Sequence, residues 1–168
     1  MNCQQYAIIM ANYNQWMNQR LYQLVATLSD EQRKEDLGAF FGSIHHTLNH
    51  LLLGDQAWLQ RFQGQPVTMK SPRDIVHDDF GLLQQARQEM DEQILAWAQA
   101  LATRYDNEQL RFYSVTYQKE IVMPLFAAVM QFFNHQTHHR GQITTLLSQM
   151  NLDIGVTDLP VMPYFINQ

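Results

Sequence analysis

The sequence predicts an all-α protein, a four-helix bundle with a long connection between its third and fourth helices. The 168 residues contain only seven glycines and five prolines, so long stretches of the chain have no helix-breaking residue. Four of these stretches repeat apolar side chains at steps of three and four residues, which places them on one face of a helix. A chain of this length is expected to form a single domain over residues 1–168.

The four helices are expected over residues 4–28, 38–62, 79–103 and 124–150. Between the first two, Ser29 and Gln32 have the spacing of a capping box, which marks the start of a helical segment. Pro66 and Pro72 follow the second helix and predict a loop there. Pro124 suits the first turn of the fourth helix, where its missing N–H is not needed.

Two segments do not follow the helical period. The connection "LRFYSVTYQKEIVM", residues 110–123, alternates and is rich in aromatic and β-branched residues. It therefore predicts a short hairpin or an extended crossover. The tail "NLDIGVTDLPVMPYFINQ", residues 151–168, is irregular but rather apolar. We expect it to pack across the helices.

The composition excludes several classes of protein. Eleven basic and sixteen acidic residues give a net charge of -5, and no basic cluster provides the surface that a nucleic-acid partner needs. No stretch of 18 apolar residues predicts a membrane span, and the N-terminus has no signal-peptide pattern. Cys3 is the only cysteine, which excludes a disulfide framework and a thiolate metal cluster. We therefore expect a cytoplasmic protein with a small-molecule substrate.

The segment "NHQTHHRGQ", residues 134–142, contains three histidines in five positions. At about 100° per residue, His135 and His139 lie about 40° apart and one turn from each other. They share their stripe with apolar residues, so both are expected to face the core. Arg140 is expected to point away, and His138 to lie at the margin. Two imidazoles at positions i and i+4 can converge on one metal ion.

A third histidine can come from the second helix. His50 lies on a face of small or polar residues, including Gly54 and Ala57, that is separate from the bulky apolar face. Small residues beyond a histidine leave a hollow, and an open metal site needs three ligands and a free position. His46 is an alternative ligand, and His77 is expected to be solvated. The alternative for the three inward histidines is ordinary hydrogen bonding in the core.

Several metal and phosphate motifs are missing. Gln136 follows His135, so the general base of the H-E-x-x-H metalloproteases is missing. No Glu-x-x-His pair occurs, which excludes the di-iron bundle pattern. No glycine-rich phosphate loop is present.

Three segments carry a resemblance to a known family: "YNQWMNQRLYQLVATLSDEQ", "GAFFGSIHHTLNHLLLGDQAWLQRF" and "NHQTHHRGQITTLLSQMNLD". In this order, and over nearly the whole chain, they resemble the damage-inducible DinB (DinB/YfiT-like) family of bacterial four-helix-bundle proteins. The resemblance implies a divalent metal ion, zinc or nickel, on His50, His135 and His139. It also implies similarity to transferases and isomerases that use low-molecular-weight thiols such as mycothiol or bacillithiol, and a homodimer.

The first functional hypothesis is a metal-dependent transferase, isomerase or hydrolase. A divalent ion on three neutral imidazoles lowers the pKa of a bound water toward about 7, or ionises a bound thiol. Several other side chains could orient ligands or line the pocket: Asp55, Asn134, Arg140, Gln142, Tyr13 and Trp58.

Two other functions are kept open. A non-catalytic metal-binding stress-response protein would close its site with a fourth ligand, and His46, Asp55 and Asp158 are the candidates. An iron oxygenase would need two histidines and one carboxylate, from Asp55 or Asp158. Iron is therefore a further candidate ion.

The second helix also provides the sequence evidence for a dimer. Its apolar arc is wider than one neighbouring helix usually covers, which favours a homodimer, although a broadly buried helix explains it too. The residues of this arc are Phe40, Phe41, Leu51, Leu52 and Leu59.

Overall fold

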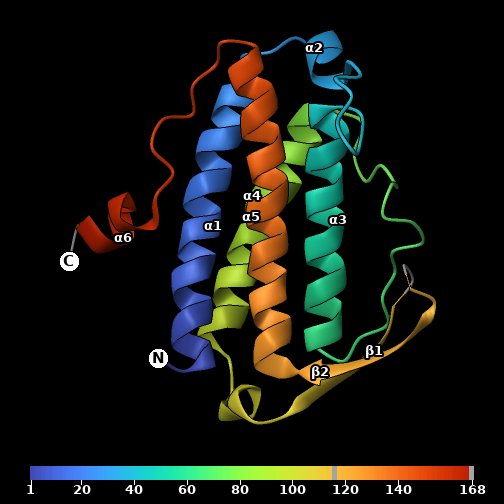
Figure 1. Ribbon diagram of the computed structural model, residues 1–168, viewed down its shortest axis with the longest axis vertical. Helices are drawn as coiled ribbons and strands as arrows, with labels where there is room; N and C mark the ends of the chain where they lie inside the picture. Colours follow the sequence, from blue (N-terminus) through green and yellow to red (C-terminus); the bar gives the residue numbers. More distant parts are fainter. Residues whose placement is uncertain (115–116, 167–168) are drawn as a thin grey trace.

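Four long helices lie side by side in the computed structural model, which describes residues 1–114 and 117–166 (Figure 1). They are α1 (Cys3–Val25), α3 (Ile44–Phe62), α4 (Phe80–Gln99) and α5 (Leu125–Gln149). Helices α1 and α3 each pack against both α4 and α5. The prediction of a mostly helical chain is confirmed.

Shorter elements join these helices or follow them. They are α2 (Asp30–Lys34), a 3-10 turn η1 (Thr103–Asp106), β1 (Gln109–Ser114), β2 (Lys119–Pro124), a second turn η2 (Leu159–Val161) and α6 (Pro163–Ile166). The core lies between the long helices and contains large side chains such as Phe132, Phe133 and Leu48, all fully buried. Burial of apolar surface contributes about 25 cal/mol per Å², so this core is the main stabilising feature.

The second long helix begins six residues later than predicted. Gly38 and Gly42 have φ angles of +70° and +81°, a left-handed conformation that interrupts a helix and favours glycine. Ser43 then caps α3, because its side chain accepts a hydrogen bond from the backbone N–H of His46. The first and third helices also end earlier than predicted, at Val25 and Gln99. The capping box of Ser29 and Gln32 is confirmed at the start of α2.

The connection between α4 and α5 is a hairpin, one of the two predicted alternatives. Strand β1 pairs antiparallel with β2, with Phe112 opposite Ile121. Residues 115 and 116, between the strands, lie outside the described part of the chain. Alternate side chains turn toward the helices, and those less exposed to solvent are Leu110, Phe112, Ser114, Ile121 and Met123. The hairpin therefore packs one of its faces against the helices.

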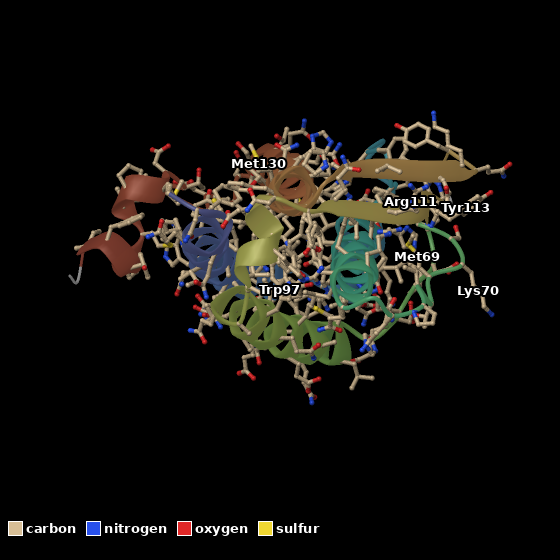
Figure 2. All side chains as sticks on the ribbon, turned by 90° about the horizontal axis from the view of Figure 1, so that it is seen from below. Met69, Lys70, Trp97, Arg111, Tyr113 and Met130 are labelled. Carbon is tan, nitrogen blue, oxygen red and sulfur yellow. The ribbon has the colours of Figure 1, made fainter. Side chains whose placement is uncertain are left out.

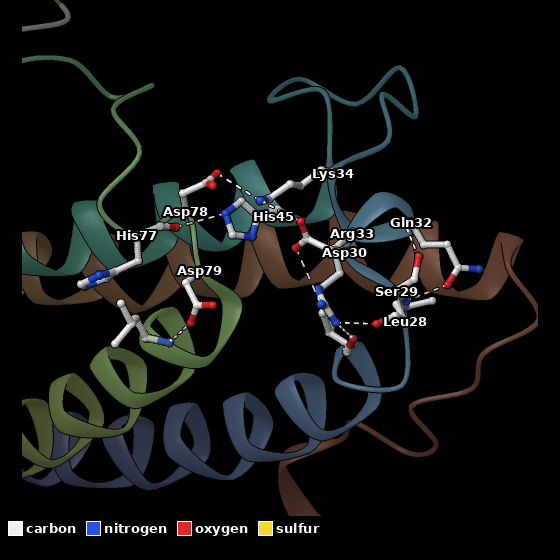
Figure 3. A network of polar contacts seen from close by, with 12 residues as sticks. Leu28, Ser29, Asp30, Gln32, Arg33, Lys34, His45, His77, Asp78 and Asp79 are labelled. Carbon is white, nitrogen blue, oxygen red and sulfur yellow. Dashed lines mark hydrogen bonds and ion pairs between the residues drawn. The ribbon is translucent and has the colours of Figure 1, made fainter.

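The loop between α3 and α4 is attached to α3 by Asn49, which is fully buried. Its amide oxygen accepts hydrogen bonds from the backbone N–H groups of Val76 and His77, both at 2.9 Å. Its amide nitrogen donates to the His77 carbonyl at 3.0 Å. Figure 3 shows His45 Nε2 beside the same carbonyl, at 3.1 Å. One segment of the loop is thus fixed beside the first turns of α3.

A second set of contacts holds this end of the loop to α2. Lys34 forms ion pairs with Asp30, at 2.9 Å, and with Asp78, at 3.1 Å (Figure 3). The Asp78 side chain is 84% exposed, and exposed ion pairs contribute little to stability because water and salt screen them. The buried hydrogen bonds of Asn49 are therefore the stronger attachment.

Polar side chains occupy the middle of the core. Asp55 on α3 and Asp91 on α4 both form ion pairs with Arg87, at 2.6 and 2.9 Å. Gln136 on α5 donates to Asp55 at 2.8 Å, and Asn18 on α1 donates to Asp91 at 2.9 Å. This buried polar network, with Asn14 and Arg140 as its other members, joins the four long helices.

The prediction that Arg140 points away from the core was wrong. The side chain is only 4% exposed, and it donates a hydrogen bond to Asn14. Its guanidinium also lies over the Tyr13 ring, 5.6 Å from the centroid. The reason is that α1 packs against the side of α5 that the sequence analysis assigned to solvent.

The tail packs against the helices, as expected, but it lies along α1 instead of across the bundle (Figure 1). Tyr13 Oη donates to the Thr157 carbonyl at 2.7 Å, and Arg20 donates to the carbonyls of Ile154 and Val156. The Met162 side chain is buried, only 1% exposed, and its burial anchors the segment that ends in α6. Residues 167 and 168 lie outside the described part. Within that part, no helix has the length and apolar character needed to cross a membrane.

Candidate metal centre

Three histidines from two helices come together between α3 and α5. His50 projects from α3, and His135 and His139 from adjacent turns of α5; one ring nitrogen of each lies within 4.8 Å of the others. The Nε2 atoms of His50 and His135 are 3.0 Å apart. Two nitrogens bound to one tetrahedral zinc ion at about 2.05 Å would be about 3.3 Å apart. The His50–His135 pair is therefore close to the spacing that one ion requires, and the His139 nitrogen lies within 4.8 Å of both.

The second ring nitrogen of two of these histidines faces a hydrogen-bond acceptor. His50 Nδ1 lies 2.8 Å from the carbonyl oxygen of Pro72. A carbonyl only accepts, so His50 donates from Nδ1 and keeps a lone pair on Nε2. His139 Nδ1 lies 2.8 Å from Oε1 of Gln142. Metal-binding histidines usually have such a partner, which fixes the tautomer and the ring orientation.

Aromatic packing restrains the rings further. Phe41, in the turn before α3, stacks on His50 with 3.9 Å between centroids and 22° between planes. Its ring also meets His139 edge-on at 5.5 Å. Phe41 is 6% exposed, so it shields this side of the cluster from solvent.

Burial keeps the three imidazoles neutral. It lowers the pKa of His50 to about 4 and that of His135 to about 3, because a charged ring would lose its hydration. The pKa of His139 is lowered for the same reason. The three rings therefore remain unprotonated at neutral pH, and a neutral imidazole is the form that binds a metal ion.

A cavity of about 490 Å³ lies beside the cluster, and His50 and His135 form part of its wall. Helix α3 contributes Trp58 and Arg61, the hairpin contributes Phe112, and the loop after α3 contributes Met69. Figure 2 shows Met69 on the same side of α3 as Arg111 and Tyr113 of β1, while Lys70 extends away from the protein. The cavity has the size of a small-molecule site, about 300–1,000 Å³.

Gly54 allows α3 and the His135 ring to approach closely. A Cβ atom built on Gly54 would lie 3.0 Å from Cε1 of His135, closer than two carbon atoms pack. The substitution Gly54→Ala is therefore expected to displace the ring. Metal affinity should fall about 10- to 100-fold, the range for losing a group that orients a metal ligand. Calorimetric titration with Zn²⁺ measures this change.

Gly141→Ala is the matched control for this prediction. Gly141 also lies within a helix, two residues after His139, but a Cβ atom there would meet nothing within 4 Å. Alanine in a helix interior is favoured over glycine by about 1 kcal/mol, so this variant should be more stable and bind metal normally. Equal metal affinities for the two variants would contradict the packing argument.

The other candidate ligands lie outside the cluster. The side chains of His46 and His138 are exposed, although the His138 ring packs 4.8 Å from that of His139. Asp55 is buried against Arg87 and Gln136. Among the described residues, the cluster contains no carboxylate, and Asp158 is not part of it. A site of two histidines and one carboxylate is therefore not supported.

Of the residues suggested to orient ligands or to line the pocket, some contact the site and others lie away from it. Gln142 contacts His139, and Trp58 lines the cavity. Tyr13 contacts the tail, and Asn134 is exposed. Pro72 could not be predicted, because a loop carbonyl 22 positions after His50 has no signal in the sequence. Asn49, which fixes that loop, precedes His50 in the sequence, but a single asparagine in a helix does not predict a contact with a distant loop.

The chain is similar to known proteins over most of its length. The family model described as "DinB family" matches residues 1–165. The chain is also similar to Protein DinB of Bacillus subtilis (strain 168), with 25% identity over an alignment 168 positions long that covers 91% of each chain. The family resemblance drawn from the three segments is thereby confirmed. The chain belongs to the DinB family.

Proposed function

We propose that this protein is a metal-dependent enzyme, a transferase or hydrolase, that holds a divalent ion on His50, His135 and His139. The observation that carries the proposal is the cavity with two of these histidines in its wall. Three protein ligands beside an open cavity leave a coordination position for water or substrate. A structural zinc ion is usually closed by four protein ligands, and the described residues bring only three together.

The ion in this proposal is zinc or nickel, with iron as a further candidate, since all three accept imidazole ligands. When bound, it supplies a Lewis acid that lowers the pKa of a bound water or thiol. Pro72 and Gln142 orient the rings of His50 and His139. Trp58 and Phe112 provide an apolar wall that excludes water from a bound substrate.

The cosubstrate in this proposal is a low-molecular-weight thiol. The family resemblance supports this choice, and so does chemistry, because thiolates bind zinc and nickel strongly. The alternative is a non-catalytic metal-binding protein of the stress response. The two functions differ in turnover, because only the enzyme transfers or hydrolyses a group with its ion in place.

Elemental analysis of untagged protein, purified without chelator, tests the proposal first. Near-stoichiometric zinc, nickel or iron is expected, and screens for thiol transfer and hydrolysis with that ion follow. Protein that contains no metal and takes up none of these three ions on titration would overturn the metalloenzyme proposal. A bound ion with no turnover in either screen would favour the non-catalytic alternative.

The assembly in this proposal is a homodimer of DinB/YfiT-like four-helix bundles. The apolar arc of the second helix no longer supports it, because Leu51, Leu52 and Leu59 are buried within one chain. Phe40 remains, 68% exposed and packed edge-on against Phe41, and a partner could cover it. Light scattering after size-exclusion chromatography gives the mass, and a monomer would contradict this assembly. The cytoplasmic location stays a prediction.

A further inference from the structure

Arg61 is a charged residue in the wall of the cavity, beyond the histidine cluster. Its guanidinium carbon lies over two neighbouring aromatic rings, 4.9 Å from the centroid of Trp58 and 4.8 Å from that of Phe112, and these two centroids are 5.6 Å apart. One ring belongs to α3 and the other to β1, so the hairpin and the helix together hold the side chain in place. Contact with both rings restricts the guanidinium and leaves its N–H groups available on the side away from the rings.

The charge of Arg61 is not balanced by the protein. Within residues 1–114 and 117–166, no carboxylate forms an ion pair with Arg61, and its buried Nε has no hydrogen-bond partner. None of the described residues that line the cavity is Asp or Glu, although the chain carries a net charge of -5. Burying a cation without a partner costs free energy, and burial lowers the pKa of Arg61 accordingly. An anionic ligand would remove this cost.

The spacing between the arginine and the histidines limits the size of such a ligand. Trp58, over which the guanidinium lies, follows His50 by eight residues, which corresponds to about 12 Å along a helix. His50, Gly54, Trp58 and Arg61 all line the same cavity. A single elongated molecule can therefore reach both ends.

We propose that Arg61 binds a carboxylate of the substrate, and that the substrate is an organic anion whose other end reaches the histidine cluster. A planar guanidinium binds a carboxylate with two parallel hydrogen bonds, which the free edge of Arg61 permits. This inference rests on the proposed function and adds to it a substrate class: an elongated carboxylic acid, about 10 Å long, with its metal-binding group at the far end.

Two thiols of equal length test the proposal on zinc-loaded protein: mercaptooctanoate, which carries a carboxylate, and mercaptooctanol, which carries a neutral hydroxyl. Arg61→Met keeps the length of the side chain and removes the charge. Its Kd for mercaptooctanoate, measured by calorimetry, should rise at least about tenfold, as expected for losing a hydrogen-bonded charge pair. Its Kd for mercaptooctanol should change less than about twofold, since no charge pair is involved.

Three controls distinguish loss of the charge pair from a general loss of structure or of binding. Arg61→Lys keeps the charge without the planar fork, so an intermediate loss is expected. Arg104→Met removes a charge from an exposed arginine whose side chain pairs with Glu108, and should leave both affinities unchanged. Mercaptopropionate is too short to reach both ends, so its affinity should not depend on Arg61. Equal changes for the two long thiols, or none, would overturn the proposal.

Failure of the metal site is distinguished by a metal-free experiment. If the wild type loads no zinc, nickel or iron, the proposed function fails, and octanoate then tests the anion site alone. Binding of octanoate to wild type, lost in Arg61→Met, would still support a carboxylate site. Absence of octanoate binding to the metal-free wild type would overturn it.

Discussion

Replacing any one of His50, His135 and His139 by alanine is expected to lower the affinity for zinc or nickel by more than about 100-fold. The loss of a group that merely orients a metal ligand costs 10- to 100-fold, and these variants lose a ligand itself. One ring nitrogen of each histidine lies within 4.8 Å of the others, and after the loss of one histidine an ion would have only two of these three ligands. Elemental analysis and calorimetric titration of each variant measure the effect, and circular dichroism verifies that the helices persist.

His46→Ala and His138→Ala are the matched controls for these substitutions. Both histidines are exposed, and one lies on each of the two helices that carry the cluster. Neither belongs to the group of converging ring nitrogens, so both variants should retain the metal content of wild type. Full metal content in any of the three cluster variants, or loss in either control, would contradict the assignment of the ligands.

The convergence of the three histidines could be predicted from local geometry. The angle between His135 and His139 depends only on the twist of one helix, and the apolar residues of their stripe indicate which way they face. The separate face of small residues around His50 similarly indicated a hollow, and the cavity beside Gly54 and Ala57 lies there. The regular geometry of single helices was therefore sufficient to predict which way these three histidines face.

The groups that hold the rings could not be predicted in this way. Pro72 contacts His50 only because Asn49 fixes the intervening loop against α3. Phe41 stacks on His50 because the segment before α3 is a turn, whereas the sequence predicted a continuous helix. Both contacts depend on the path of irregular backbone, for which side-chain periodicity contains no information.

The position of Arg140 shows why the periodicity of a single helix does not always predict which residues are buried. A helical wheel with one buried face assigns every opposite residue to solvent, but α5 packs against both α1 and α3. A helix between two neighbours buries a wider arc than one stripe. A buried polar residue on that arc needs hydrogen-bond partners from another helix, and Asn14 provides one for Arg140. Such pairings are properties of the assembled helices and cannot be obtained from one segment.

Asp55→Ala is expected to destabilise the fold by about 3–5 kcal/mol, the cost of breaking a buried ion pair by removing one partner. Asp55 is fully buried, and Arg87 is 3% exposed. The variant would leave Arg87 with Asp91 as its ion-pair partner, and Gln136 would lose the carboxylate to which it donates. Because a domain is stable by about 5–15 kcal/mol in total, this loss should be evident in urea denaturation.

The exposed pair of Arg111 and Glu120 provides the control for this stability effect. Its atoms are 2.9 Å apart, similar to the buried pairs, but the side chains are 65% and 62% exposed. Glu120→Ala should therefore change stability by less than about 1 kcal/mol. Arg87→Met should destabilise at least as much as Asp55→Ala, since it removes the guanidinium that pairs with both buried carboxylates. If Asp55→Ala were no more damaging than Glu120→Ala, the buried network would not add to the stability that the apolar core provides.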